Sequence, residues 1–506
     1  MLLFSGPAIA SQVSAAEAVR IADRDEKVVE QRRDEGELTH IATKSDGNWE
    51  VGYFAGDEQV AQVIVDPATG TVRESWTGYQ VAWKMAHSYP GAFGHKLNAP
   101  YVFLPLCALF LIGLLDWRRP WRIANLDLLV LLGFGVSHLF FNRAEIGVSV
   151  PLQYPVLLYL LGRCLWIGLP GRGEGLRPVW PAAWLLIVAL FLIGFRVGLN
   201  VADSGAIDVG YAGVVGGDRI AHGEPLYGNF PADVAQGDTY GPVSYLAYVP
   251  FEAIWPWQGE WDDLPAAHGA AVFFDLATFA LLILLGHRIR PGPRGRMLAA
   301  TLAFGWAAYP YTAFALESNS NDSLVALLLV ATLLLLARPA ARGALLALAT
   351  LTKFAPLVLA PMLATHGSRA RWFAPAFVAT AAILMLWPAI DPGLATFYDR
   401  TIGYQADRDS PFSIWGQVPS LEPLRIAILV IVAAMSAAFA FWPRQKTVPQ
   451  VAALGAALLI VLQLTAEHWF YLYIVWFYPL VLLAIALDRQ DKDIDISDSR
   501  NQHSPL

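Results

Sequence analysis

The chain has few charged residues and few cysteines for its length. Only 15% of its 506 residues are Asp, Glu, Lys or Arg, against roughly 25% in soluble domains, and 56% are hydrophobic. A single soluble core cannot bury that apolar excess, so the composition indicates an integral membrane protein. Both cysteines, Cys107 and Cys164, lie in apolar runs, so we expect neither a disulfide nor a cysteine-based metal site.

Several motifs of soluble enzymes are also missing from the sequence. It contains no Walker A loop, no Gly-x-Gly-x-x-Gly after a strand, no His-Glu-x-x-His and no Gly-x-Ser-x-Gly. Their absence argues against an energy-coupled pump and against an enzyme that uses a soluble nucleotide. A substrate that already lies in the membrane fits this sequence better.

The first 95 residues lack the long apolar runs of the remaining chain. Residues 1–14 have an apolar stretch and a small-residue end but no basic segment, so they are either a signal-peptide remnant or a disordered end. Residues 15–95 predict a soluble α+β domain, with a charged helix near 15–33 and alternating strands at 49–54 and 59–65. A third strand is expected after the turn Asp66-Pro-Ala-Thr-Gly.

Apolar runs close to bilayer length begin at Tyr101. Residues 101–179 are expected to form accessory transmembrane helices and residues 180–487 the membrane core, followed by a disordered tail, 488–506. The predicted fold is an α-helical polytopic membrane protein of about eleven transmembrane helices plus re-entrant segments, with a small N-terminal α+β extracytoplasmic domain. The predicted spans lie near 101–116, 124–142, 149–168, 180–198, 267–287, 297–316, 322–337, 372–390, 424–442, 449–466 and 468–487.

Basic residues set the predicted orientation of these spans. Arginines and lysines gather after the first, third, fifth, seventh and ninth spans, and cytoplasmic loops carry such an excess. The N-terminus, residues 15–95 and the long loop 200–265 are therefore predicted to be extracytoplasmic. The C-terminus is predicted to be cytoplasmic.

One apolar run, residues 343–366, does not fit this alternation, because both of its flanks are basic. It contains Lys353-Phe-Ala-Pro356 and Pro361, and proline interrupts a helix. Non-helical backbone at membrane depth is tolerated where protein surrounds it. We predict a re-entrant or broken hairpin that leaves Ser368 cytoplasmic, and a twelfth span is the alternative. Residues 241–257 are likewise interrupted by prolines, and we expect an interfacial or re-entrant helix there.

The loop 200–265 is long, acidic and aromatic, and such loops are usually functional. Asp203 and Asp208 follow the fourth span, where a carboxylate can ionise and stay close to a membrane-bound substrate. Glycosyl transfer with inversion needs one carboxylate to take the proton of the acceptor hydroxyl; a solvated loop acid is the other interpretation. Further along, Asp262 and Asp263 are weak candidates to bind a divalent ion, or they cap the helix that begins near Pro265.

Ionisable residues within apolar runs are costly and therefore suggest a function. Lys353 and Asp275 are two of them, and they either pair with one another or Lys353 meets the phosphate of a lipid-linked sugar donor. Arg196 is a second phosphate candidate, with snorkelling to the interface as the alternative. His468 starts the last predicted span, where it either binds substrate or is structural. The outer loop 397–415, with Gln405 and Arg408, mixes polar and aromatic groups suited to a sugar ring or to an interfacial aromatic belt.

Two parts of the chain resemble known families. The helix, the Trp49-x-Val strand and the Asp66-x-x-Thr-Gly-x-Val turn resemble the PepSY domain, which implies a binding or regulatory module. The order Asp208-x-x-Tyr211, Gly223-x-x-x-Tyr227 and Tyr240-Gly-Pro resembles the first outer loop of membrane glycosyltransferases of the GT-C superfamily. It is most similar to the branch that uses polyprenyl-phosphate-mannose.

Further motifs resemble that branch in the same order. They are Asn319-Ser-Asn321-Asp322, Leu351-Thr-Lys353-Phe-Ala-Pro356 and the segment beginning His468-Trp-Phe-Tyr, so the resemblance covers about 180–487. The chain departs from the branch where Tyr-Gly-Pro replaces Tyr-Pro-Pro, and where three spans and the PepSY-like domain precede the core. These departures leave the substrate open.

The resemblance implies a glycosyltransferase of the bacterial cytoplasmic membrane that moves mannose or a pentose from a polyprenyl-phosphate donor to an extracytoplasmic lipid or glycan acceptor. Asp208 maps onto the acid taken as the catalytic base, Asp203 is its rival, and Lys353 or Arg196 would bind the donor phosphate. The resemblance implies no cofactor other than a divalent cation, and the expected partners are the donor, the acceptor and membrane lipids, with no nucleic acid. The implied substrate-binding residues are Tyr211, Tyr227, Tyr240, Asn319, Asn321, Gln405, Arg408 and His468.

Two other functions remain open from the sequence. A transporter or lipid flippase would also contain intramembrane charges and broken helices, but usually with symmetric internal repeats, which the hydropathy does not show. The other is a PepSY-type sensor whose membrane part is only structural.

Overall fold

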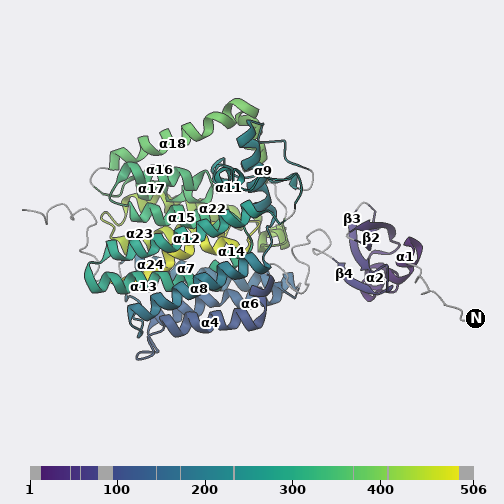
Figure 1. Ribbon diagram of the computed structural model, residues 1–506, viewed down its shortest axis with the longest axis horizontal. Coiled ribbons are helices and arrows are strands. Elements are labelled where there is room, and N and C mark those ends of the chain that lie inside the picture. Colours follow the sequence, from purple (N-terminus) through teal and green to yellow (C-terminus); the bar gives the residue numbers. More distant parts are fainter. Residues whose placement is uncertain are drawn as a thin grey trace, which may run out of the picture. The chain divides into compact units, whose positions relative to one another are not determined.

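The computed structural model describes residues 13–45, 47–56, 58–77, 95–143, 145–170, 173–231, 234–261, 263–367, 370–406 and 410–488. The chain divides into two compact units, of which one comprises Met1–Ala92 with Leu139–Ile146 and the other Phe93–His138 with Gly147–Leu506. The first contains a small β-sheet, and the second contains most of the helices (Figure 1).

The N-terminal part has two short helices and a four-stranded antiparallel sheet in the order β1-β2-β3-β4. Its core contains apolar side chains from both helices and from alternating strand positions, such as Ala18, Val28, Val51 and Val63. The elements are α1 (Ala15–Ala22), α2 (Glu26–Glu35), β1 (Thr39–Ser45), β2 (Asn48–Ala55), β3 (Glu58–Val65) and β4 (Val72–Thr77).

The predicted strands and turn of this part are confirmed, with two differences. The single helix expected over 15–33 is two helices, because the Asp25 carboxylate caps α2 by accepting a hydrogen bond from the Lys27 amide at 3.0 Å. Strand β1 was not predicted. Its apolar residue Ile41 is exposed, so the strand lacks the alternation of buried apolar and exposed polar residues that indicates a strand. The predicted turn is closed by Asp66, which accepts hydrogen bonds from the amides of Ala68 and Thr69. The remaining residues of the predicted domain, 78–94, lie outside the described part.

The large unit consists of helices that lie side by side, with α9 and the segments around it at one end (Figure 1). The longer helices are α4 (Pro100–Leu114), α5 (Ile123–Leu132), α6 (Phe134–Phe141), α7 (Ile146–Gly168), α8 (Ala182–Asp203), α9 (Asp208–His222), α12 (Pro265–Ile289), α13 (Gly292–Ala308), α14 (Pro310–Glu317), α15 (Asp322–Leu334), α16 (Pro339–Thr350), α18 (Phe373–Pro388), α22 (Glu422–Phe441), α23 (Val448–Gln463) and α24 (Ile474–Ala486).

Six helical segments of the described chain are long and apolar enough to cross a membrane, so eleven full-length spans are not found. The predicted span 297–316 is divided into α13 and α14, because Tyr309 before Pro310 adopts an extended conformation. Four other predicted spans coincide with the shorter apolar helices Pro100–Leu114, Asp322–Leu334, Val448–Gln463 and Tyr471–Ala486. The six long segments are Ile123–Phe141, Ile146–Gly168, Ala182–Asp203, Pro265–Ile289, Ala370–Ala406 and Pro419–Phe441.

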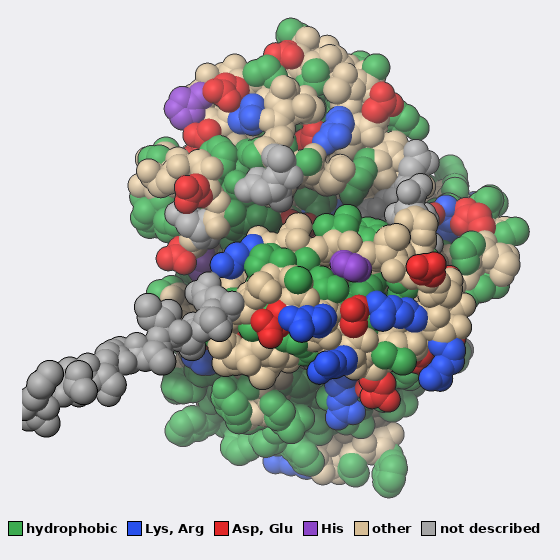
Figure 2. Space-filling model, turned by 90° about the vertical axis from the view of Figure 1, so that its right-hand side faces the viewer, with side chains coloured by type: hydrophobic (Ala, Val, Ile, Leu, Met, Phe, Trp, Pro, Cys, Tyr) green, Lys and Arg blue, Asp and Glu red, His purple; other side chains and the backbone are tan. Residues whose placement is uncertain are grey.

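Burial separates the central helices from the peripheral ones. Every residue of α24 is buried, whereas only 11% of the most apolar window of Ala370–Ala406 is buried. Exposed apolar residues of this kind indicate contact with lipid. Hydrophobic side chains cover most of the lower part of the view in Figure 2, where few charged side chains are visible.

The run 343–366 forms a broken hairpin. Helix α16 is followed by a turn at 351–354, the 3-10 segment η4 (Ala355–Leu359) and the short helix α17 (Ala360–Ala364). The buried Arg342 guanidinium donates hydrogen bonds to the carbonyls of Leu336 and, at 2.7 Å, His366. The two ends of the run therefore lie together, which is the geometry of a segment that enters and returns.

Candidate functional site

The tip of this hairpin places a lysine in a polar and aromatic environment inside the large unit. The Lys353 Nζ atom lies 3.4 Å from the Asp322 Oδ1 atom and 4.0 Å from the centre of the Tyr240 ring. The Trp476 ring lies 5.6 Å from the same ammonium. Lys353 is 5% exposed and Asp322 is 1% exposed, so the charges are buried and paired. We refer to Tyr240, Asp322, Lys353 and Trp476 as the lysine cluster.

The Asp322 carboxylate is held by neutral donors as well as by the lysine. Its Oδ1 atom accepts a hydrogen bond from the Trp476 indole at 2.9 Å, and its Oδ2 atom accepts one from the Ser320 hydroxyl at 2.7 Å. Asp322 is the first residue of α15, where the helix dipole favours a negative charge. These contacts hold the Asp322 side chain beside Lys353.

Two buried tyrosines fix the backbone of Tyr240. The Tyr227 hydroxyl donates to the Tyr240 carbonyl at 3.0 Å. The Tyr245 hydroxyl accepts from the Tyr240 amide at 3.2 Å and donates to the Gly237 carbonyl at 2.7 Å. Burial raises the pKa of the Tyr227 hydroxyl well above its ordinary value, so it remains a donor. Tyr227, predicted to touch substrate, supports Tyr240 here.

Gly241 explains the departure from the Tyr-Pro-Pro pattern. A Cβ atom at this position would lie 2.1 Å from the Leu351 carbonyl oxygen. The same carbonyl accepts a hydrogen bond from the Val243 amide at 3.0 Å, and the Ser244 hydroxyl donates to the Thr352 carbonyl at 2.7 Å. The Tyr-Gly-Pro segment therefore packs directly on the hairpin tip and sets the position of Lys353.

A second ion pair joins the loops 200–265 and 397–415. The Arg400 guanidinium contacts the buried Asp238 carboxylate at 2.8 Å and 2.6 Å, and the hydrogen bond to Asp238 raises the pKa of Arg400. Asp238 also accepts a hydrogen bond from the Gly228 amide. Neither charged residue was predicted as part of a site, and their pairing links the 397–415 loop to the segment that ends in Tyr240.

The two predicted candidates for a base differ in their surroundings. Asp203, at the end of α8, accepts a hydrogen bond from the Lys96 amide at 2.8 Å and pairs with its ammonium at 2.9 Å. The hydrogen bond to Asp203 raises the pKa of Lys96. Asp208, the first residue of α9, is exposed, and its Oδ1 atom accepts from the Val209 amide at 2.9 Å. The ion pair assigns Asp203 an anchoring role, while Asp208 stays accessible.

Close packing on the turn before α15 positions the start of α9. The Ile207 amide donates to the Ser318 carbonyl at 3.1 Å, and a Cβ atom on Gly210 would lie 2.3 Å from the Asn319 carbonyl oxygen. Three residues of chain, at most about 11 Å, separate Asn319 from Asp322. This turn therefore connects the Asp208 end of α9 to the lysine cluster.

Asn319 has a structural role in that turn. Its backbone has φ +51°, in the left-handed region that asparagine tolerates better than most residues. Its side-chain oxygen accepts from Asn200 at 2.8 Å, and its amide donates to the Ser204 hydroxyl at 2.9 Å. His268, on α12, lies 3.1 Å from Asn200 through its Nδ1 atom. Sequence reasoning did not predict Asn200, Ser204 or His268, which have no motif-like spacing.

The predicted pairing of Lys353 with Asp275 is wrong. Asp275 pairs with Arg196 at 2.8 Å and also accepts from the Trp306 indole at 2.9 Å. Arg196 additionally donates to the Trp306 carbonyl and the Thr312 hydroxyl, both at 3.1 Å. Since Arg196, on α8, is 2% exposed and makes these contacts with α12, α13 and α14, it does not snorkel to the interface. It holds the helices together.

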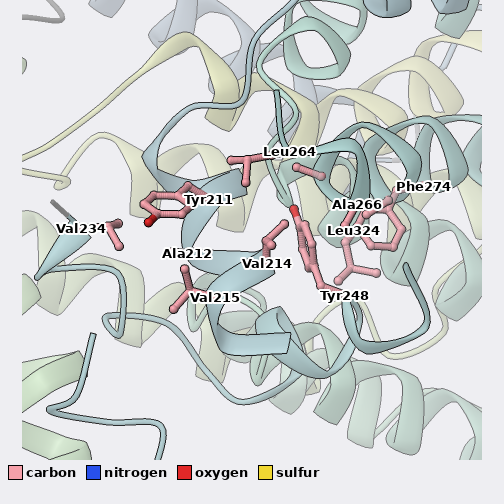
Figure 3. Packing of buried hydrophobic residues seen from close by; sticks show 12 residues of the cluster. Tyr211, Ala212, Val214, Val215, Val234, Tyr248, Leu264, Ala266, Phe274 and Leu324 are labelled. Carbon is pink, nitrogen blue, oxygen red and sulfur yellow. The ribbon is translucent and has the colours of Figure 1, made fainter. Parts of the chain in front are cut away.

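The other predicted residues are dispersed. Tyr211 is buried in the cluster with Val214, Tyr248 and Phe274 shown in Figure 3, so it packs rather than contacts solvent. The buried Asn321 amide has no hydrogen-bond partner among the described residues. The His468 Nδ1 atom lies 2.9 Å from the Ser410 hydroxyl. Gln405, five residues before Ser410 in the same loop, is exposed.

Candidate metal ligands are not brought together in the described part of the chain. It contains no group of three His, Cys, Asp or Glu side chains suited to a metal ion. Asp263 is exposed at the start of the segment that leads into α12. The predicted residues Asp262 and Arg408 lie outside the described residues.

Part of the chain, including most of the lysine cluster, matches a known protein family. Residues 239–465 match the model of glycosyltransferase family 87, a family of membrane enzymes of the GT-C type. The matched segment contains Tyr240, Asp322 and Lys353, begins after Asp208 and ends before His468. No curated protein matches the chain. With the six apolar helices, the match supports a multi-pass membrane protein that is similar to glycosyltransferases. The resemblance to PepSY stays a prediction.

Proposed function

We propose that the chain is an integral membrane glycosyltransferase that takes mannose or a pentose from a polyprenyl-phosphate donor and transfers it to an extracytoplasmic lipid or glycan acceptor. The main support is the meeting of Tyr240, Asp322 and Lys353 inside the segment that matches glycosyltransferase family 87. These residues come from three separate parts of the sequence, and the fold joins them at the tip of a broken hairpin.

Asp208 is the base in this proposal. The acceptor hydroxyl oxygen attacks the anomeric carbon, the bond from that carbon to the phosphate oxygen breaks, and the Asp208 carboxylate takes the hydroxyl proton. The phosphate leaves with the bonding electron pair, and the anomeric configuration inverts. Asp208 suits this role because its side chain is exposed at the first position of α9.

Lys353 offsets the charge that develops on the departing phosphate. Its ammonium has three N–H donors, and the contact with Asp322 leaves others that a phosphate oxygen can share. The adjacent Tyr240 and Trp476 rings keep water away and favour a cation. Arg196 is not assigned to the donor, because its guanidinium serves Asp275 and the neighbouring backbone.

The test is sugar transfer by the purified protein in lipid vesicles. Radiolabelled polyprenyl-phosphate mannose and polyprenyl-phosphate pentose are supplied separately, with a bacterial lipid extract as acceptor. We expect one of them to label the acceptor, and Lys353→Met to abolish labelling. Lys446→Met is the matched control, because Lys446 is also buried and its ammonium donates to the Pro443 carbonyl instead of contacting the lysine cluster. Failure of both donors, with folding intact, would refute the proposal.

A further inference from the structure

A half-exposed tryptophan lies next to the proposed base. Trp261 stacks on Tyr211, with ring centres 4.7 Å apart and planes inclined by 27°. Its indole N–H donates to the Ala206 carbonyl at 3.0 Å. Tyr211 covers one face of the ring, and Trp261 is still 42% exposed, so part of the indole surface is open to a ligand.

The segment that leads to this ring is held in place by its own contacts. The buried Glu252 carboxylate accepts a hydrogen bond from the Trp257 amide, and the Trp257 indole donates to the Glu260 carbonyl at 2.9 Å. The Trp257 ring also meets Tyr211 edge to face, with centres 5.9 Å apart. The Trp261 ring is therefore held by its stack on Tyr211 and by its hydrogen bond to the Ala206 carbonyl, and the segment before it is held by the contacts of Trp257.

Its location suggests what the ring binds. Ala206, which accepts the indole hydrogen bond, is two positions before Asp208, and Asp208 is exposed. Glu260 and Asp263, one and two positions from Trp261 in the sequence, are exposed as well. An open indole face packs against the C–H face of a sugar ring, and neighbouring carboxylates accept hydrogen bonds from its hydroxyls.

We infer that Trp261 is a stacking platform for a sugar ring, positioned to hold that ring next to Asp208. This inference rests on the proposed function, of which it defines one subsite. The sugar belongs either to the acceptor or to the donor, and the chemistry of recognition is the same for both.

The same segment provides a control that separates sugar stacking from membrane anchoring. Trp255 is also 42% exposed, but its ring packs over Gly269 rather than on Tyr211. If these tryptophans served only as interfacial anchors, replacing either one would have the same effect. If Trp261 binds sugar, only its replacement affects sugar binding.

Saturation-transfer NMR on the full-length protein in lipid nanodiscs tests this directly. The probes are methyl α-D-mannopyranoside and methyl α-D-arabinofuranoside, added separately. We expect saturation of the ring protons of one probe with the parent protein and with Trp255→Leu, and its loss with Trp261→Leu. Trp261→Phe, which keeps an aromatic face, should retain part of the signal. Equal signals in the parent and Trp261→Leu, or no signal from either probe, would overturn the inference.

Competition then assigns the source of the sugar. A polyprenyl-phosphate sugar that displaces the probe places the donor sugar on Trp261, whereas an unaffected signal places the acceptor sugar there. In transfer assays, Trp261→Leu should raise the KM of that same substrate by about three- to tenfold, the scale of one aromatic contact. The NMR signal does not require turnover, so loss of the platform and loss of the proposed transferase activity are separate outcomes.

Discussion

Asp203 and Asp208 are close in sequence, and their different partners lead to different expectations. Asp208→Asn keeps the shape of the side chain but removes its basicity, so sugar transfer should fall by about 10²–10⁴-fold. Asp203→Asn breaks the ion pair with Lys96, whose side chain is 58% exposed, and should leave transfer nearly unchanged. The measurement is transfer from a radiolabelled donor by each purified variant. Full activity of Asp208→Asn with an inactive Asp203→Asn would identify Asp203 as the base.

The two buried ion pairs allow a matched comparison of a structural pair with a functional one. Removing one partner of a buried pair typically costs about 3–5 kcal/mol, because the other charge is left uncompensated. The double variant Arg196→Met/Asp275→Leu should therefore lower the unfolding temperature less than either single change. It should also keep transfer activity. The measurements are thermal unfolding in detergent and sugar transfer.

The double variant Lys353→Met/Asp322→Leu should differ from the first double variant in activity but not in stability. This double variant should also unfold at a temperature close to that of the parent, but it should not transfer sugar, because the group that meets the phosphate is gone. An active Lys353→Met/Asp322→Leu protein would rule out the phosphate role of Lys353.

At the scale of elements, the contact between the Tyr-Gly-Pro segment and the hairpin tip depends on one glycine. Gly241→Ala places a methyl group 2.1 Å from the Leu351 carbonyl, so the tip must shift, at a cost of about 1–3 kcal/mol. We expect lower transfer activity, because the tip contains Lys353. Gly198→Ala is the control, since nothing lies within 4 Å of a Cβ atom there. Unchanged activity of Gly241→Ala would show that the position of the tip is not critical.

The hairpin also makes a prediction about sidedness. Because Arg342 binds the His366 carbonyl, cysteines at Ala340 and at Ser368 should react with a reagent from the same side of the membrane, and basic flanks predict the cytoplasmic side. Labelling from outside in intact cells, compared with labelling of opened vesicles, measures this. Reaction of the Ser368 cysteine from outside, with the Ala340 cysteine protected, would mean that the run crosses the membrane.

At the scale of the whole molecule, the charge pattern predicts that residues 15–95 and the loop 200–265 are extracytoplasmic. Exposed positions in each, Thr43 and Gln236, are suitable sites for single cysteines. Both should react with an impermeant reagent added to intact cells. Protection of either cysteine, when it reacts in opened vesicles, would contradict this topology.

The sequence by itself determined much of the architecture. Composition indicated a membrane protein, apolar runs located the helices, and in the N-terminal part alternation located two of the four strands and a turn located a third. The prolines and basic flanks of 343–366 predicted a broken hairpin. These features are local, since helix length, proline geometry and side-chain alternation depend on neighbouring residues. The length of each helix was less well predicted, as the break between α13 and α14 shows.

Only the tertiary structure decided which charges meet. Sequence spacing could not show that Lys353 faces Asp322, that Asp275 faces Arg196, or that Asp203 is engaged by Lys96. Asp322 is visible in the sequence as a carboxylate that opens an apolar run. Its place in the lysine cluster depends on Trp476 and Lys353, which are distant in sequence. The hydrogen bond of Trp261 to Ala206, two positions before Asp208, is a second such case. A buried charge selects its partner by proximity in three dimensions, and that proximity is set by the packing of helices far apart in the chain.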